Sequence, residues 1–229
     1  MSSIVIRAPK IALLSGSLRQ GSFNTQLIAA AQSVLDTLGA ETHHVSLQDY
    51  DNLPLYSQDL EAAQGMPAAA VALKQALGTA DAWVVSSPEY NGFPTPLLLN
   101  AYTWCSRGDA DGDMYATFRN KTALVTGASP GAMGGLRAIA PHRQLLQNLG
   151  VHVTSHTVAI GKAFHAFATN EEGQTILSDE KQRDSLHAAL EALYYKARDE
   201  ANRDAACDLI QAHWRNAGEY GAVSTPTAA

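Results

Sequence analysis

Residues 15–24 read Ser-Gly-Ser-Leu-Arg-Gln-Gly-Ser-Phe-Asn, and they stand between two segments of different character. A short apolar run, Ile11 to Leu14, precedes them, and an alanine- and leucine-rich segment ending at Leu38-Gly39 follows. This order predicts a strand, then a tight loop of Gly, Ser and Asn, then a helix. Such a unit points backbone N–H groups and the N-terminus of its helix at one anionic group. The pattern therefore predicts a βα unit that binds a phosphate.

The same loop departs from the nucleotide-triphosphate motif. Gly16 and Gly21 have its spacing, but Ser22 and Phe23 stand where it needs Lys and then Ser or Thr. The loop thus lacks both a charge anchor and a magnesium ligand, and Arg19 is its single cation. Hydroxyl and amide groups around one cation suit a phosphate monoester bound without metal. The expected donors are Ser15, Ser17, Ser22 and Asn24. The alternative is an ordinary strand-to-helix turn with a good N-cap.

The composition indicates one soluble α/β enzyme domain. The chain has 229 residues, 46% of them hydrophobic, and no apolar run approaches the roughly 20 residues of a membrane span. Residues 1–7 lack the apolar centre of a secretory signal, so we expect a cytoplasmic protein without a membrane partner. A net charge of −6 with scattered Lys and Arg argues against nucleic acid as the main partner.

Apolar runs of β type alternate with helix-compatible segments along the chain. The expected strands are 11–14, 42–47, 82–86, 123–126 and, with polar interruptions, 151–160. The expected helices are 23–38, 67–78, 96–107, 135–148 and 180–198. Five strands with intervening helices imply a parallel sheet covered on both faces. Residues 48–66 form one long irregular connection, which is typical of a lid, an interface loop or a disordered segment.

Three loops are expected at one edge of this sheet, because ligands bind beyond the carboxyl ends of parallel strands. Strand three is followed by Pro-Glu-Tyr-Asn-Gly at 88–92, and strand four by Gly-Ala-Ser-Pro-Gly-Ala-Met-Gly-Gly at 127–135. The tight path of 88–92 can present N–H groups to the edge of a flat heterocycle, with Tyr90 as an aromatic surface. The glycines of 127–135 suit the close approach of a ligand and equally suit a helix start.

Four motifs together resemble the NADPH-dependent FMN reductase family, which includes bacterial quinone, azo-dye and chromate reductases. They are Gly-Ser-Leu-Arg-x-Gly-Ser-Phe-Asn at 16–24, Leu-Pro-Leu-Tyr at 53–56, Pro-Glu-Tyr-Asn-Gly at 88–92 and Ser-Pro-Gly-Ala-Met-Gly-Gly-Leu-Arg at 129–137. The resemblance runs from about Lys10 to Ile160. It implies a flavodoxin-like FMN-binding domain over 8–200, and we assign 201–229 to a C-terminal helical extension and tail.

The resemblance also implies the site. It makes FMN the cofactor and NADPH or NADH the cosubstrate, with a quinone, azo compound, metal oxyanion or free flavin as acceptor. Its implied phosphate ligands are Ser17, Arg19, Ser22 and Asn24, its ring-lining residues are Pro88, Glu89, Tyr90 and Asn91, and Ser129 with its loop, Gly131 included, closes the site. Where many members carry Lys and Asp after the third motif, this chain has Leu99 and Thr103. This departure concerns salt bridges that those charges would form between subunits, and it does not affect the expected flavin site.

Hydride transfer between nicotinamide and flavin requires no side-chain acid or base, so we expect no catalytic residue in that sense. We assign the backbone N–H groups of Asn91 and Gly92 to the N5/O4 edge of the ring, and the start of the helix after Met133 to its N1/O2 side. Glu89 is then a carboxylate that orders its loop. Two other function classes stay open: an FMN-binding electron carrier or multimeric scaffold with little turnover, and a sugar- or nucleotide-phosphate enzyme.

Histidine and cysteine patterns predict no metal site. His152 and His156 lie four residues apart in a predicted strand, roughly 13 Å from each other, which is too far to share a tetrahedral metal. His43 and His44 point to opposite faces of their strand. Cys105 and Cys207 are far apart and form no CxxC, and Cys105, beside Trp104, is expected to be a small buried hydrophobe.

The C-terminal third predicts an assembly. From Glu180 to Trp214 no Pro or Gly interrupts the helical composition, but the apolar stripe changes phase. The first stripe, expected to close the helical layer of the sheet, is Leu186, Leu190, Leu193 and Ala197. The second, which has no obvious core to enter, is Ala206, Ile210, His213 and Trp214. We therefore expect a homodimer or homotetramer, the alternative being a terminal segment that folds back on its own subunit.

Overall fold

A computed structural model of the chain describes residues 6–108, 113–203 and 207. Its centre is a parallel sheet in the order β2-β1-β3-β4-β5, with β6 also paired to β4. The strands are β1 (Lys10–Ser15), β2 (Glu41–Val45), β3 (Ala82–Ser86), β4 (Thr122–Ala128), β5 (His152–Val153) and β6 (Val158–Ile160). The strand order reverses between β1 and β3, so the edge beyond these two strands is where a ligand site is expected.

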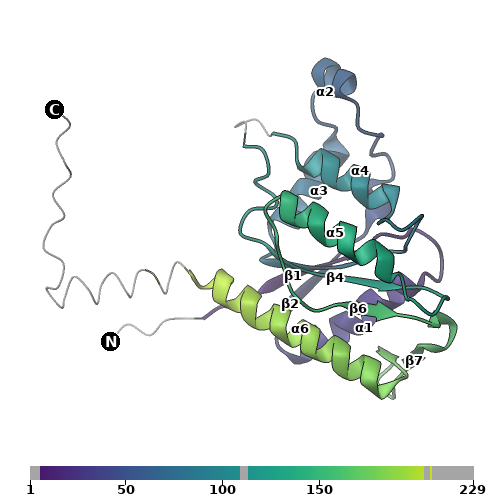
Figure 1. Cartoon of the computed structure of the whole chain (residues 1–229). Helices are drawn as coiled ribbons and strands as arrows, with labels where there is room; N and C mark the ends of the chain where they lie inside the picture. The colour runs from purple at the N-terminus through teal and green to yellow at the C-terminus, as the bar shows by residue number, and fades with distance from the viewer. Residues whose placement is uncertain (1–5, 109–112, 204–206, 208–229) are drawn as a thin grey trace, which may run out of the picture.

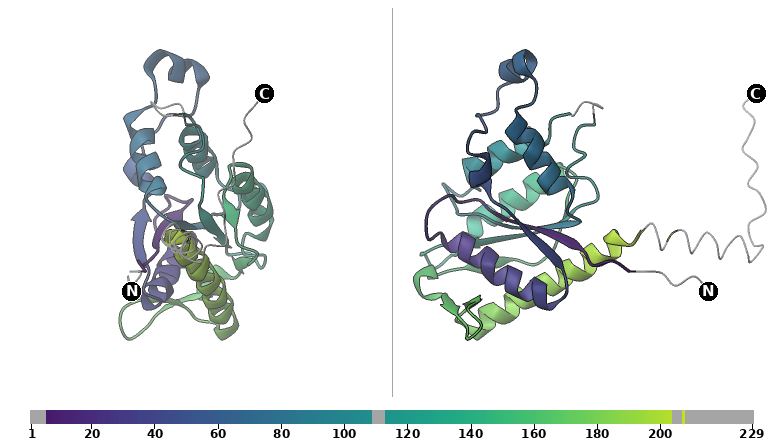
Figure 2. Two further views of the ribbon diagram at one scale, coloured as in Figure 1. Left: turned by 90° about the vertical axis from the view of Figure 1, so that its left-hand side faces the viewer. Right: turned by 180° about the vertical axis from the view of Figure 1, so that it is seen from behind.

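Helices cover both faces of the sheet, as the sequence predicts (Figures 1 and 2). Helices α1 (Phe23–Thr37) and α6 (Glu180–Ala201) lie on one face. Helices α3 (Ala68–Gly78), α4 (Pro96–Cys105) and α5 (Leu136–Asn148) lie on the other. The strands serve both layers because alternate side chains point to opposite faces: Val84 enters the first core, whereas Trp83 and Val85 enter the second.

Helix α6 closes the first layer by the expected stripe. The buried residues of this helix include the four predicted ones, Leu186, Leu190, Leu193 and Ala197. They share one core with Leu27, Ile28 and Leu35 of α1, and the two helices run side by side (Figure 2). The second predicted stripe, 206–214, lies outside the described residues, and the boundary at 200/201 stays a prediction.

The structure corrects two expectations about secondary structure and adds elements that were not predicted. Residues 48–66 are not irregular throughout: they contain the end of a 3-10 turn, η1 (Leu47–Tyr50), and helix α2 (Gln58–Gln64). Ser57 caps α2 at its N-terminus and Gly65, with φ of 75°, ends it. The expected strand 151–160 is divided into β5 and β6. A short turn and a hairpin were not predicted at all, namely η2 (Ala163–His165), β7 (Phe167–Thr169) and β8 (Thr175–Leu177).

Candidate functional site

The loop between β1 and α1 is held by its own hydroxyl groups. Ser22 is the N-cap of α1, and its Oγ accepts hydrogen bonds from the backbone N–H of Asn24 at 3.2 Å and of Thr25 at 3.5 Å. Ser17 Oγ accepts from the N–H of Arg19 at 3.3 Å, and Ser15 Oγ accepts from Thr25 Oγ1 at 3.1 Å. In each bond the serine uses a lone pair and keeps its own O–H for a further acceptor.

Arg19 carries an uncompensated charge at this loop. Its guanidinium donates to the carbonyl oxygens of Gln20 and Gly21, both at 3.2 Å, and lies 5.4 Å from the centre of the Phe23 ring. Within the described residues no carboxylate forms an ion pair with it. An exposed cation of this kind can bind an anion without first breaking a salt bridge.

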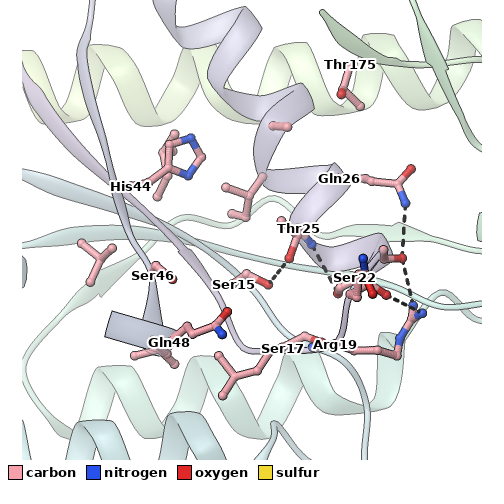
Figure 3. Close-up of a pocket in the computed structure, with 18 residues that line it drawn as sticks. Ser15, Ser17, Arg19, Ser22, Thr25, Gln26, His44, Ser46, Gln48 and Thr175 are labelled. Atoms are coloured by element: carbon pink, nitrogen blue, oxygen red, sulfur yellow. Dashed lines mark hydrogen bonds between the residues drawn. The ribbon is translucent and has the colours of Figure 1, made fainter. Parts of the chain in front are cut away.

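A cavity of about 660 Å³ opens beside this loop (Figure 3). It shares the loop residues Ser15, Ser17, Arg19 and Ser22 and extends along α1 toward the end of β2. The 18 residues that line it include no Asp or Glu, although the chain has 22 acidic residues, so the lining favours an anionic group. No residue of 88–92 or 129–135 lines this cavity, which separates it from the expected ring site.

Asn24 has a structural role that the sequence did not suggest. Its side chain is 3% exposed and donates from Nδ2 to the carbonyl of Ala128 at 3.0 Å. Its Oδ1 accepts from the N–H of Ala128 at 3.0 Å and from Ser86 Oγ at 2.9 Å. The amide therefore ties the start of α1 to the ends of β3 and β4, and the expectation that Asn24 also binds the phosphate stays a prediction.

The loop after β3 forms a tight turn with free donors. Tyr90 and Phe93 exchange two backbone hydrogen bonds of 3.0 Å, and Asn91 and Gly92 between them have φ of 56° and 82°. Positive φ at both central positions is the type I′ turn that Asn-Gly favours. The described residues offer no hydrogen-bond partner to the N–H of Asn91 or Gly92. These two groups can therefore meet the edge of a ring, as the sequence predicts.

Glu89 links this loop to the next one. Its carboxylate accepts from Arg137 Nε at 2.6 Å and from the Arg137 backbone N–H at 3.1 Å, at the start of α5. The N–H of Leu136 donates to Met133 and that of Ala138 to Gly135. These first-turn donors are thus used within the protein, and the placement of the N1/O2 side of a flavin at the start of α5 stays a prediction. Glu89 orders the loop, as expected.

The glycines of the loop after β4 serve packing more than ligand approach. A Cβ on Gly134, whose φ is 60°, would lie 2.6 Å from backbone atoms of Ala159 and Ile160. A Cβ on Gly161 would lie 2.3 Å from the carbonyl oxygen of Ala132. Gly131 is different, because its Cβ would meet only Ser129 Oγ, at 3.7 Å. The segment 161–165, which sequence reasoning missed, is thus packed against this loop.

The three loops meet at the reversal of the strand order. The N–H of Gly16 donates to the carbonyl of Ser86 at 2.8 Å, and Thr95 Oγ1 donates to the carbonyl of Gly16 at 2.9 Å. A Cβ on Gly16 would lie 2.4 Å from Leu98 Cδ1, so a larger residue here would require the Leu98 side chain to shift. Of the predicted site residues, Ser15, Ser17, Arg19 and Ser22 surround the cavity, and 88–92, Ser129 and Gly131 border the neighbouring edge.

The remaining titratable residues offer no second reactive centre. Cys105 is fully buried, and burial raises the pKa of its thiol to about 12, so it is a core residue as expected. His142 is also buried, with Nε2 3.0 Å from Tyr102 Oη, and burial lowers its pKa to about 4. Across the described ranges no group of three or more His, Cys, Asp or Glu could hold a metal ion. No helix within them is long and apolar enough to cross a membrane.

Comparison with known proteins agrees with this geometry. Residues 9–165 match the sequence profile of the NADPH-dependent FMN reductases. An NAD(P)H-dependent FMN reductase of Pseudomonas aeruginosa is 35% identical over 185 residues, which cover 80% of this chain and 92% of that protein. An NAD(P)H:quinone oxidoreductase of Solanum tuberosum is 32% identical over 186 residues, covering 80% and 90%. Among solved structures, a flavoenzyme NAD(P)H:(acceptor) oxidoreductase of Paracoccus denitrificans superposes with a TM-score of 0.68 at 26% identity, over 84% of this chain and 99% of that one.

Proposed function

The chain belongs to the NADPH-dependent FMN reductase family, and from this premise we propose where and how it performs the reaction. It is an oxidoreductase that uses FMN and NAD(P)H. We propose that the FMN phosphate lies in the loop of residues 15–22, and that the ring lies between 88–92 and 129–135. The observation that carries this proposal is Arg19, which has no carboxylate partner among the described residues. It lies beside serine hydroxyls at the start of α1 that can still donate a hydrogen bond.

The residues present fit the cofactor. A phosphate monoester needs several donors and a positive environment, which the serine hydroxyls, the α1 N-terminus and Arg19 supply. A flavin ring needs donors along one edge, which the free N–H groups of Asn91 and Gly92 supply. Tyr90, 55% exposed, adds an aromatic surface beside them. FMN supplies the acceptor and donor of hydride when it is bound.

The work of the protein is then to bind and orient. The Glu89–Arg137 pair fixes the two ring loops relative to each other, and Asn24 fixes the phosphate loop to both strands that carry them. The N–H groups of Asn91 and Gly92 would hold the edge of the ring and would favour its electron-rich form. No side chain in this arrangement has to transfer a proton.

The acceptor class in this proposal is a small oxidant such as a quinone, an azo compound, a metal oxyanion or a free flavin. A purified yellow protein with flavin absorbance, bleached by NADPH under anaerobic conditions, supports the assignment. A steady-state panel of these acceptors with NADPH and NADH then ranks them. A preparation that neither binds FMN nor oxidises either nucleotide would contradict the proposal.

An electron carrier with little turnover is the second candidate, since the same site would serve it. Such carriers usually present a strongly acidic docking face, whereas the acids and bases of this chain are interspersed. Turnover of NADPH with a small acceptor at many cycles per second favours the enzyme. Reduction that stops after one equivalent of NADPH favours the carrier.

We also propose a cytoplasmic homodimer or homotetramer, because NAD(P)H is a cytoplasmic reductant and an apolar residue is displayed on a rigid loop. Leu55 is 81% exposed, but its neighbours are fixed. The carbonyl of Pro54 accepts from Asn100 and Trp104, and the N–H of Tyr56 donates to Asn100. We propose that this fixed and exposed leucine lies in the contact between subunits.

Light scattering tests the assembly. A dimer or tetramer at micromolar concentration that dissociates in Leu55→Asp supports it, and a fully active monomer overturns it. Truncation after Ala201 tests the part of the terminal helix outside the described residues. Assembly that survives this truncation excludes that part as its cause.

A further inference from the structure

A cluster of aromatic and cationic residues lies next to the phosphate loop but belongs to none of the predicted site segments. Phe164 follows β6 and is 71% exposed, although its ring packs edge to face with Phe23 at 5.1 Å between centroids. The same Phe23 ring lies 5.4 Å from the Arg19 guanidinium. Lys162, two residues before Phe164, is exposed as well. We call Lys162, Phe164 and their neighbour Phe23 the aromatic–lysine cluster.

Backbone hydrogen bonds hold this cluster against the ring loop. The N–H of Lys162 donates to the carbonyl of Gly131 at 3.1 Å, and the N–H of Ala163 donates to the carbonyl of Ser129 at 3.1 Å. Lys162 has φ of 52°, a conformation that glycine adopts more readily than lysine. The cluster thus lies between the start of α1 and the loop 129–131, at the same sheet edge as the proposed flavin.

The charge at this place is positive and unpaired. Within the described residues Lys162, like Arg19, forms no ion pair with a carboxylate. His165 is exposed on the same turn. Phe164 can stack on a heteroaromatic base, and the ammonium group of Lys162, two residues away in the chain, can bind a phosphate of the same ligand by charge.

We propose that the aromatic–lysine cluster binds the adenosine phosphate portion of a nucleotide, with the adenine on Phe164 and a phosphate on Lys162. This inference rests on FMN binding in the adjacent loop. Two nucleotides carry that chemistry: NADPH, through its adenosine 2′-phosphate, and a flavin dinucleotide, through its adenylate. If the ligand is NADPH, Lys162 also distinguishes NADPH from NADH, because only NADPH has the 2′-phosphate.

Steady-state kinetics of the FMN-loaded protein separates the two contacts. We expect Lys162→Ala to raise the KM for NADPH about tenfold and to leave the KM for NADH within twofold. Phe164→Ala should raise both KM values about tenfold, because both nucleotides carry adenine, and Phe164→Tyr should restore them. Lys196→Ala, on the exposed side of α6, is the matched control and should change neither.

Flavin titration of the apoprotein provides the second arm. If the cluster binds a flavin dinucleotide, Lys162→Ala and Phe164→Ala lower the affinity for FAD about tenfold. The affinity for FMN and the KM values for NADPH and NADH then stay unchanged. If neither the NADPH KM nor the FAD affinity changes, the proposal is wrong. It is also wrong if Lys162→Ala weakens FMN itself, since the lysine then contacts the FMN phosphate.

Adenosine 2′,5′-bisphosphate is a probe that does not depend on turnover. Wild-type protein should bind it by calorimetry, and Lys162→Ala should bind it at least tenfold more weakly. If the wild type binds neither FMN nor NADPH, the proposed function has failed, yet this titration still reports on the cluster. Absence of binding to wild type in protein that retains FMN overturns the cluster alone.

Discussion

The loop after β1 and the loop after β4 have similar compositions but opposite uses. Both are rich in Gly and Ser and both lead from a buried strand into a helix. In the first loop, the start of α1 is capped only by Ser22 and faces a cavity with Arg19 beside it. In the second loop, Glu89 already occupies the start of α5, and Gly134 packs against the backbone of β6. We therefore expect an anion at the glycine-rich turn before α1, where the first N–H groups have no carboxylate partner among the described residues, and not at the turn before α5.

The largest effect should come from breaking the packed loop. In Gly134→Ala the new Cβ would lie 2.6 Å from backbone atoms at a φ of 60°, so the backbone of one of the two segments must shift to accommodate it. We expect the free energy of unfolding to fall by about 3 kcal/mol or more, measured by urea denaturation. Gly131→Ala in the same loop has open space and should cost less than about 1 kcal/mol. Equal losses in the two variants would contradict the packing role.

The free energy of unfolding should depend on pH through His142 of α5, the helix that follows the packed loop. His142 on α5 is buried with a pKa lowered from 6.5 to about 4, so the folded protein holds it neutral. Its contribution is therefore fully present above about pH 6.5 and is lost as the pH falls through about 4, by about 3 kcal/mol in all. Denaturation between pH 7 and 4 measures this loss. His142→Gln should flatten the slope, whereas Tyr102→Phe, which keeps the histidine, should preserve it.

Removing the cation tests the open loop. Arg19→Ala should weaken FMN binding by about 1–3 kcal/mol, because a charge-assisted contact is lost. The stability of the apoprotein should change little, since Arg19 bonds only to carbonyls of its own loop. Fluorescence titration with FMN measures the affinity. An unchanged affinity for FMN would show that the phosphate does not bind at residues 15–22.

A matched pair of glycines isolates the turn at the ring edge. Gly92 and Gly173 have φ of 82° and 79°, and a Cβ on either meets nothing within 4 Å. Gly92→Val and Gly173→Val should therefore lose similar stability, about 1–2 kcal/mol. Only Gly92→Val should also impair FMN binding or reduction, as stopped-flow spectroscopy with NADPH would show. Parental flavin kinetics in Gly92→Val would exclude 88–92 from the ring site.

The smallest effect is expected for Glu89→Gln. An amide keeps part of the contact with Arg137, whose side chain is 73% exposed, so stability should change by less than about 1 kcal/mol. The turnover number should stay within a fewfold, because hydride transfer needs no base. A loss of about a hundredfold or more would instead identify a general acid or base.

Sequence patterns were sufficient wherever a local signal decides the structure. The positions of four strands, β1 to β4, and the tight turn that ends at Gly92 follow from periodicity and backbone preference. Helix α2 also had local signals, Ser57 and Gly65, but a long polar connection concealed them. The contact between Gly161 and Ala132 and the orientation of Asn24 depend on residues far apart in the chain, so no local pattern could show them.

Asn24 also fixes the distance between the loop after β1 and the sheet. Its amide pairs with both backbone groups of Ala128, as a neighbouring strand would, and so extends the sheet by one rung at the site where the phosphate loop begins. The separation between that loop and the turn after β3 is then set by the rigid sheet rather than by a ligand. In the proposed placement of FMN, a flavin with a side chain shorter than ribityl should bind more weakly, because it cannot span this fixed separation as well. The enzyme should accordingly select flavins by the length of that chain as well as by the presence of the phosphate.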